Sequence, residues 1–145
     1  MTKQLRCVPL LVSLVLVVPV AAALGAKVQV GPVKGGFYSG TLHHEEIVLE
    51  VAKNGKSVRV SLPVAPAYCQ GGSSAEEQKT QASAISGSGR FTTRIAYFVR
   101  HTSKQFATVT ISGSFYGRVF QGTAKSSFTP AKSCNGQESF EAKAG

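Results

Sequence analysis

The sequence predicts an all-β protein: an antiparallel β-sandwich or a small closed β-barrel of about eight or nine strands, preceded by a signal peptide. Two observations favour this fold class. Apolar and aromatic side chains alternate with polar ones along most of residues 24–145, and clusters of Gly, Ser, Asn and Pro separate the alternating stretches. The alternation alone does not decide between a sandwich and a barrel, although closure would remove the exposed edges of the sheet.

Residues 1–23 show the three parts of a secretory signal peptide in the expected order. Lys3 and Arg6 give a positive start, an apolar run follows from Leu10 to Val20, and three alanines occupy positions 21–23. The apolar run is shorter than the roughly 20 residues that span a bilayer, so the sequence predicts no transmembrane segment. We therefore expect residues 24–145 to form a single all-β domain that is secreted and works extracellularly.

The cysteines predict one disulfide. Cys7 lies in the leader and is removed with it, which leaves Cys69 and Cys134 as a pair in an oxidising compartment. Two cysteines without a neighbouring histidine favour a disulfide over a zinc site, which needs three or four ligands.

The clearest local element is a hairpin around Asn54-Gly55. Both residue types tolerate positive φ, so the dipeptide predicts a two-residue type I′ turn. That turn sets the register and places Val51 opposite Val58 on one face and Glu50 opposite Arg59 on the other. The apolar pattern gives the same register.

Later strands follow from the same alternation. Pro63 and Pro66 end the second strand of the hairpin, and the Gly- and Ser-rich residues at about 70–89 predict a flexible loop. Gly113 is expected to break a strand. Further strands are expected at residues 91–100, 106–112, 115–120, 123–128 and 138–142.

The order of these features is similar to that of a group of small secreted β-domain proteins of Gram-positive actinobacteria that have no assigned function. The features that carry the resemblance are Gly36-Phe37-Tyr38-Ser39-Gly40-Thr41, Asn54-Gly55, Cys69, Gly89-Arg90-Phe91, Gly113-Ser114-Phe115, Gly122-Thr123-Ala124, Cys134-Asn135-Gly136 and Phe140. The resemblance implies a β-domain with a disulfide. It implies no activity, and no functional residues transfer from it.

Basic and aromatic side chains suggest a binding surface. Without Lys3 and Arg6 of the leader, 14 Lys and Arg stand against 7 Glu, a formal charge of +7. Arg94, Phe98 and Arg100 share one strand parity, and Tyr97 and Arg118 occur nearby. Such a stripe can hold sugars by stacking or an anionic polymer by charge. The alternative is that the aromatic residues form the core and the arginines cover its rim.

The segment His43-His44-Glu45-Glu46 is the densest group of metal-ligand side chains. On a strand, His43 and Glu45 point to one face, and His101 is a third candidate ligand if folding brings it near. Two ligands on a face are fewer than zinc needs, so we expect a polar strand end and no metal site.

These observations favour a non-enzymatic role without a cofactor. The chain has no Asp and no strand-turn-helix nucleophile elbow, so a hydrolase, with Glu45 and His44 as the residues to test, is the least favoured class. We expect binding of a cell-wall or other anionic or glycan polymer, and not of nucleic acid as the native ligand. The alternative is a small-molecule-binding barrel, because Gly36-Phe37-Tyr38 resembles the first strand of lipocalin- and avidin-like barrels. The oligomeric state stays open.

Overall fold

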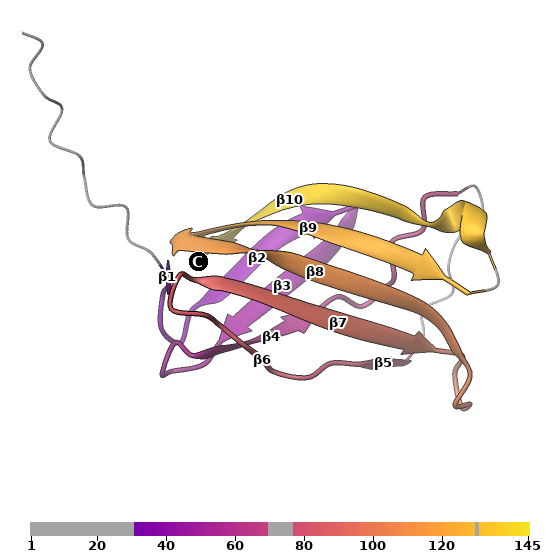
Figure 1. Ribbon diagram of the computed structural model, residues 1–145, viewed down its shortest axis with the longest axis horizontal. Helices are drawn as coiled ribbons and strands as arrows, with labels where there is room; N and C mark the ends of the chain where they lie inside the picture. The colour runs from indigo at the N-terminus through magenta and orange to yellow at the C-terminus, as the bar shows by residue number, and fades with distance from the viewer. Residues whose placement is uncertain (1–30, 70–76, 130) are drawn as a thin grey trace, which may run out of the picture.

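The computed structural model describes residues 31–69, 77–129 and 131–145, and the predicted signal peptide lies outside them. These residues form one sheet curled into a half-barrel (Figure 1), with the strand order β5-β7-β8-β9-β10-β2-β3-β4-β6. The short strand β1 pairs in parallel with β8. The elements are β1 (Gly31–Pro32), β2 (Phe37–Leu42), β3 (Glu45–Val51), β4 (Ser57–Ser61), β5 (Glu77–Lys79), β6 (Ser83–Ala84), β7 (Arg90–Phe98), β8 (Gln105–Gly117), β9 (Val119–Phe128), the 3₁₀ helix η1 (Lys132–Cys134) and β10 (Gly136–Ala144).

The prediction of an all-β fold is confirmed. Each strand pairs antiparallel with its neighbours in this order. The short segment that contains β5 and β6 forms both edge strands of the sheet. β5 pairs with β7, and β6, a few residues later, pairs with β4. Both short strands lie inside the region expected to be a loop at 70–89. No helix among the described residues is long and apolar enough to cross a membrane.

Aromatic side chains fill the interior of the curled sheet. Phe115 lies at its centre, and its ring centroid is 4.9 Å from that of Tyr38 and 5.0 Å from that of Phe120. Phe120 in turn lies 5.2 Å from Phe91 and 5.6 Å from Phe140. All five side chains are buried. The predicted alternation therefore sends these rings inward and leaves the polar residues between them on the outer face.

The hydroxyl of Tyr38 satisfies two backbone groups inside the half-barrel. It donates a hydrogen bond to the Gly117 carbonyl at 2.5 Å and accepts one from the Val33 N–H at 2.6 Å. Burial raises the pKa of this hydroxyl, which therefore stays protonated and can donate. This side chain thus links the chain before β2 to the β8–β9 turn.

The prediction that Gly113 breaks a strand is wrong. β8 runs through Gly113, which pairs with Gly122 on β9. A Cβ atom at either glycine would come within 2.5 Å of a ring carbon of Phe120. The backbone of the neighbouring strand is also close, since a Cβ at Gly113 would clash with the Gln121 carbonyl oxygen and one at Gly122 would lie 2.8 Å from that of Ser112. The two glycines therefore allow the close approach of both the ring and the neighbouring strand, a role that glycine also has in strands.

The register of the Asn54-Gly55 hairpin is confirmed, but its turn type is not. Val51 pairs with Val58 and Glu50 with Arg59, as expected. Gly55 has a φ of 73°, whereas Asn54 is not among the residues with positive φ, as a type I′ turn would require. The Asn54 side chain instead accepts a hydrogen bond from the Lys56 N–H at 2.9 Å, as in an Asx-turn.

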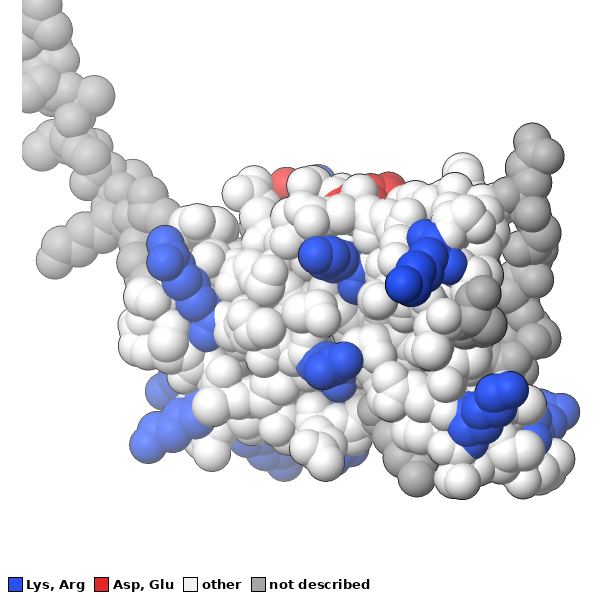
Figure 2. Space-filling model, turned by 45° about the vertical axis from the view of Figure 1, so that its right-hand side comes forward, with Lys and Arg blue, Asp and Glu red and all other residues white. Residues whose placement is uncertain are grey.

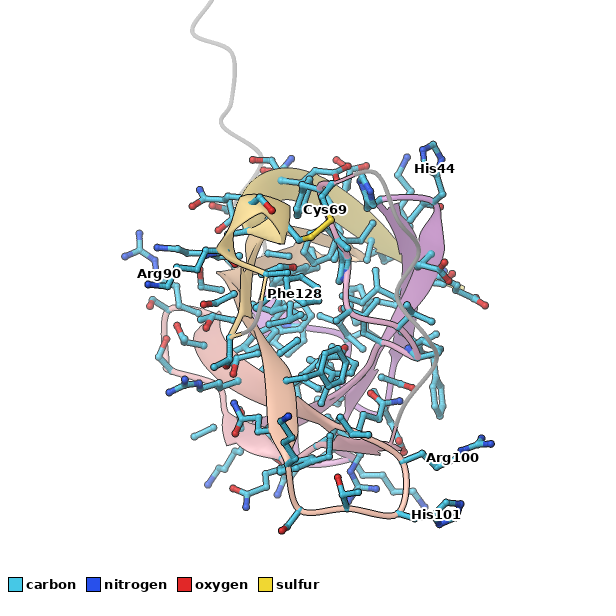
Figure 3. All side chains as sticks on the ribbon, turned by 90° about the vertical axis from the view of Figure 1, so that its right-hand side faces the viewer. His44, Cys69, Arg90, Arg100, His101 and Phe128 are labelled. Atoms are coloured by element: carbon cyan, nitrogen blue, oxygen red, sulfur yellow. A yellow bond between two sulfur atoms is a disulfide. The ribbon has the colours of Figure 1, made fainter. Side chains whose placement is uncertain are left out.

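The predicted disulfide between Cys69 and Cys134 is present, with the two Cα atoms 4.5 Å apart. It joins the segment after β4 to η1, next to a hydrogen bond from the Tyr68 N–H to the Cys134 carbonyl. Figure 3 shows the bond at the end of the half-barrel that faces the viewer. A disulfide is compatible with an oxidising, extracellular environment.

Candidate binding groove

Small polar side chains line up across the outer face of β7, β8, β9 and β10. The register places Thr92 beside Ser112, Ser112 beside Thr123, and Thr123 beside Ser139. The next row along the strands contains Arg90, Ser114, Gln121 and Glu141 in the same order. Four strands thus present two adjacent rows of hydroxyl, amide and charged groups on one face.

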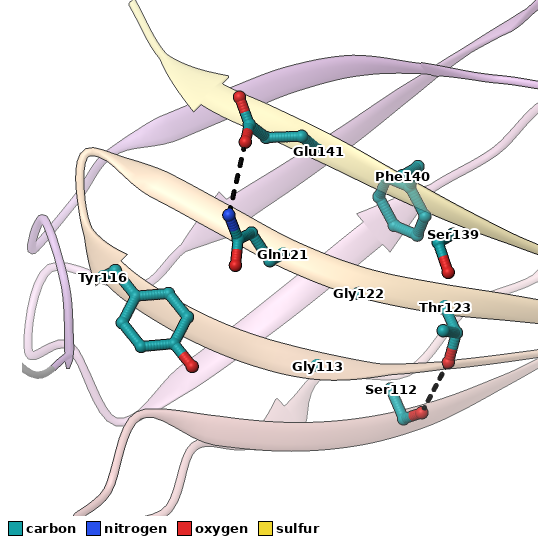
Figure 4. Close-up of a pocket in the computed structure, with 9 residues that line it drawn as sticks. All are labelled: Ser112, Gly113, Tyr116, Gln121, Gly122, Thr123, Ser139, Phe140 and Glu141. Carbon is teal, nitrogen blue, oxygen red and sulfur yellow. Dashed lines mark hydrogen bonds between the residues drawn. The ribbon is translucent and has the colours of Figure 1, made fainter.

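This face contains two open hollows that join. Figure 4 shows the first, over β8, β9 and β10, and the second extends from β8 across β7 to the segment at 84–86. Both are lined by Ser112 and Gly113, so these shallow, open hollows adjoin, and we call them together the outer groove. Its main lining residues are Ile85, Ser86, Arg90, Thr92, Ser112, Gly113, Ser114, Tyr116, Gln121, Gly122, Thr123, Ser139 and Glu141.

Hydrogen bonds hold several of these side chains in place. The hydroxyls of Ser112 and Thr123 lie 3.3 Å apart, and the Gln121 amide donates to the Glu141 carboxylate at 3.4 Å (Figure 4). Lys143 lies 3.2 Å from the same carboxylate. The hydrogen bond from Lys143 and, after it, that from Gln121 lower the pKa of Glu141. Glu141 is therefore ionised and already paired.

Tyr116 is the aromatic surface of the outer groove. Its side chain is 48% exposed although it is large, and its ring lies against the outer face near the β8–β9 turn (Figure 4). No ring among the described residues packs on it. An exposed ring beside hydroxyl and amide groups is suited to stacking on the apolar face of a sugar.

Arg90 lies at the opposite end of the outer groove from Glu141. It is exposed, extends away from the sheet in Figure 3, and forms no ion pair with a described carboxylate. Figure 2 shows that basic side chains on the face in view are separated by uncharged ones, with acidic side chains only at the upper edge. In the outer groove, β7 therefore contributes the positive charge of Arg90, whereas on β10 the negative charge of Glu141 is paired with that of Lys143.

The structure does not bring the five predicted binding residues together. Arg94 is exposed on the outer face of β7, but Arg100 lies in the turn after this strand, and Figure 3 shows it on the side away from Arg90. A register shift between Tyr97 and Phe98 also interrupts the expected parity. The strand predicted at residues 91–100 extends beyond the end of β7 at Phe98.

Tyr97 and Arg118 have structural contacts. Tyr97 is buried, its hydroxyl donates to the Leu62 carbonyl at 2.9 Å, and burial raises its pKa strongly. It is therefore unavailable to a ligand on the outer face. Arg118 lies in the β8–β9 turn, where its guanidinium donates to the carbonyls of Ala144 and Gly145 at 3.0 and 2.9 Å.

The candidate metal ligands are also separated. His43 and His44 form the β2–β3 turn, with φ values of 49° and 71°, so His43 is not on a strand beside Glu45 as expected. His43 instead lies 3.7 Å from the Glu138 carboxylate. Figure 3 shows His44 and His101 on opposite sides of the same end of the half-barrel. Among the described residues, no three His, Cys, Asp or Glu side chains are grouped for a metal.

The left-handed turn at His43-His44 gives a stability prediction. A non-glycine residue in this conformation costs roughly 1–3 kcal/mol. We expect His44→Gly to raise the free energy of unfolding by about 1 kcal/mol, measured by urea denaturation. The control is His44→Ala, which keeps Cβ and is not expected to stabilise the protein. An equal gain in both variants would show that the backbone conformation is not its source.

Comparisons with protein-family models, with curated proteins and with solved structures give no match, so the chemistry of the groove is the basis for a functional interpretation. Of the described residues that line the outer groove, Glu141 is the one carboxylate, and none is a histidine. Glycoside hydrolysis needs a pair of carboxyl groups, and nucleophilic hydrolysis needs a positioned base. The groove is suited to hydrogen bonding and stacking.

The pattern that forms the groove could not be found from one strand alone. Ser112, Thr123 and Ser139 are far apart in the sequence and are ordinary outward residues of three strands. Only the register of β8, β9 and β10 places them in a row. The one signal in the sequence is that Ser, Thr and Gln recur at outward positions of these strands, which does not by itself mark a groove.

Proposed function

We propose that the protein is exported and acts outside the cell as a non-enzymatic domain that binds a glycan chain in the outer groove. The observation that carries this proposal is the outer groove across β7, β8, β9 and β10. It combines hydroxyl and amide groups with the exposed ring of Tyr116. Sugars offer the complementary groups, since each ring has hydroxyls at its edge and an apolar face.

Export is supported by two independent features. The leader has the composition of a signal peptide, and the disulfide between Cys69 and Cys134 suits an oxidising compartment. Polymers of the cell wall and of the extracellular matrix are the glycans that an exported protein meets. An open groove is suited to a polymer because a chain can enter it from the side.

The two other functional classes have less support. A small-molecule-binding barrel needs interior space, whereas Tyr38 and Phe120 are fully buried inside the half-barrel and both pack on the buried ring of Phe115. A hydrolase based on His44 and Glu45 would act at the β2–β3 turn, outside the outer groove.

The experiment that tests the proposal is a pull-down of the protein on insoluble cell wall, chitin and cellulose at low and high salt. We expect retention on at least one of these polymers. Tyr116→Ala should weaken it about tenfold, or about 1.4 kcal/mol, because the ring surface on which a sugar would stack is removed.

The matched control for this test is Phe37→Ala. Phe37 is also an exposed aromatic residue, at 60%, but it does not line the outer groove. We expect Phe37→Ala to bind like the unaltered protein. The proposal fails if no polymer is retained at low salt, or if the two substitutions have equal effects.

A further inference from the structure

The outer groove does not end at β7 but continues into a third hollow at the end of the half-barrel. This hollow shares Ala84, Ile85 and Ser86 with the part of the groove beside Arg90. We call it the lysine pocket. The lining residues that matter here are Lys34, Asn54, Gly55, Lys56, Ile85 and Ser86.

Three connections between strands form the lysine pocket. The chain before β2, the β3–β4 turn and the segment after β6 converge here, and the Ile85 N–H donates to the Lys56 carbonyl at 2.8 Å. The aliphatic part of Lys34 lies across Gly55, since a Cβ at Gly55 would be 3.0 Å from Lys34 Cγ. The exposed side chains of Lys34 and Lys56, from two different connections, thus line one hollow.

The lysines of the pocket have no anionic partner within the described part of the chain. The ion pairs described there are His43–Glu138 and Lys143–Glu141, and neither involves Lys34 or Lys56. No carboxylate of the described residues lines the pocket. The side-chain oxygen of Asn54 already accepts the Lys56 N–H. An anion in the pocket would therefore meet positive charge that no described side chain neutralises.

The chemistry changes along the path from Tyr116 to Lys56. The part over β8, β9 and β10 offers hydroxyl and amide groups and a paired carboxylate, whereas β7 adds the guanidinium of Arg90, which no described carboxylate pairs. The lysine pocket then adds two basic residues, Lys34 and Lys56. A neutral chain would leave these cations unused, whereas a chain with anionic groups would match them.

We propose that the lysine pocket is an anion-binding subsite and that the glycan in the outer groove carries phosphate, sulfate or carboxylate groups, one of which lies between Lys34 and Lys56. This inference rests on the proposed function, because it assigns the chemical class of the polymer. The sugar rings occupy the part of the groove at Tyr116, and the charged group occupies the end at the lysines.

The test uses three probes with one backbone: dextran, carboxymethyl-dextran and dextran sulfate. We expect the two charged polymers to bind more tightly than dextran at low salt, and the difference to shrink at high salt. The ratio between the carboxylate and sulfate probes identifies which anion the site prefers. Equal binding of dextran and both charged forms would overturn the inference.

A double substitution separates a site from a general effect of net charge. Lys34→Ala/Lys56→Ala should weaken binding of the charged probes about tenfold, since two charge contacts are removed. The control Lys104→Ala/Lys132→Ala removes the same charge from exposed positions that do not line the pocket. The inference is overturned if both pairs of substitutions weaken binding equally.

The same measurements distinguish the failure of this inference from that of the proposed function. If Tyr116→Ala weakens binding of every probe but the Lys34/Lys56 pair behaves like its control, the glycan groove stands and the anion subsite does not. If the lysine pair alone matters and Tyr116→Ala has no effect, the anion subsite stands and the sugar-stacking groove does not.

Discussion

Replacing Phe120 by alanine is expected to lower the free energy of unfolding by about 3–5 kcal/mol, as is usual for a fully buried aromatic ring. Phe120 has no exposed surface and packs against Phe91, Phe115 and Phe140, with centroid distances of 5.2, 5.0 and 5.6 Å. The surrounding strands cannot collapse into the space that the ring leaves, because the other rings are held by their own strands. Urea denaturation monitored by circular dichroism measures this change.

A second substitution tests whether the Phe120 ring and Gly122 are energetically coupled through their close contact. Gly122→Ala should cost about 1–3 kcal/mol in the unaltered protein, because its Cβ would come within 2.5 Å of the Phe120 ring. In the Phe120→Ala background the ring is absent, and the cost of Gly122→Ala should fall by at least about 1 kcal/mol. Strict additivity of the two changes would contradict the proposed contact.

The matched control for the loss of the ring is Phe37→Ala. Phe37 is the same residue type but is 60% exposed at the start of β2. Its substitution should change the free energy of unfolding by no more than about 0.5 kcal/mol. A large loss from Phe37→Ala would show that aromatic content, and not burial, determines the stability of this sheet.

The alternation of apolar and polar residues predicts burial well where side chains point strictly inward and outward in turn along a strand. Ile95 and Tyr97 on β7 and Val109 and Ile111 on β8 are all buried, as their spacing predicts. The β3–β4 register was also predictable, because apolar pairing and the turn agree. Gly113 was not, because a glycine that accommodates a ring and a glycine that ends a strand look alike in a sequence.

The candidate site was less predictable than the fold, for a geometric reason. Parity along one strand suggested Arg94, Phe98 and Arg100, but β7 ends at Phe98 and a register shift precedes it. A groove across a sheet depends on the alignment of several strands. The outer groove and the lysine pocket join segments that meet only after the sheet curls, so no local pattern contains them.

Removing the disulfide between Cys69 and Cys134 is expected to cause the second large loss of stability. The bond links residues 65 positions apart, so in the chain-entropy treatment it stabilises the fold by about 4 kcal/mol, within a usual range of roughly 2–5 kcal/mol. Cys69→Ala/Cys134→Ala should lower the free energy of unfolding by that amount. Removing both cysteines avoids a free thiol, and urea denaturation again provides the measurement.

The contacts around the bond indicate where its loss acts first. Tyr68 donates its N–H to the Cys134 carbonyl, and the Asn135 side chain accepts the Phe128 N–H at 2.7 Å. The first bond holds the end of the segment at 62–69 against the β9–β10 connection, and the second braces that connection internally. Without the disulfide, hydrogen exchange should increase at these two amides, while the amide of Ile111 in the middle of β8 should stay protected in the folded state.

The chemically reduced, unsubstituted protein is the control that separates the covalent link from side-chain packing. Reduction removes the bond without removing any side chain, so its effect should match that of the double alanine variant within about 1 kcal/mol. Intact mass before and after reduction, a difference of two hydrogens, verifies that the bond was present. If the reduced protein is as stable as the oxidised one, the contacts of Tyr68 and Asn135 hold this end of the half-barrel on their own, and the link contributes nothing to stability.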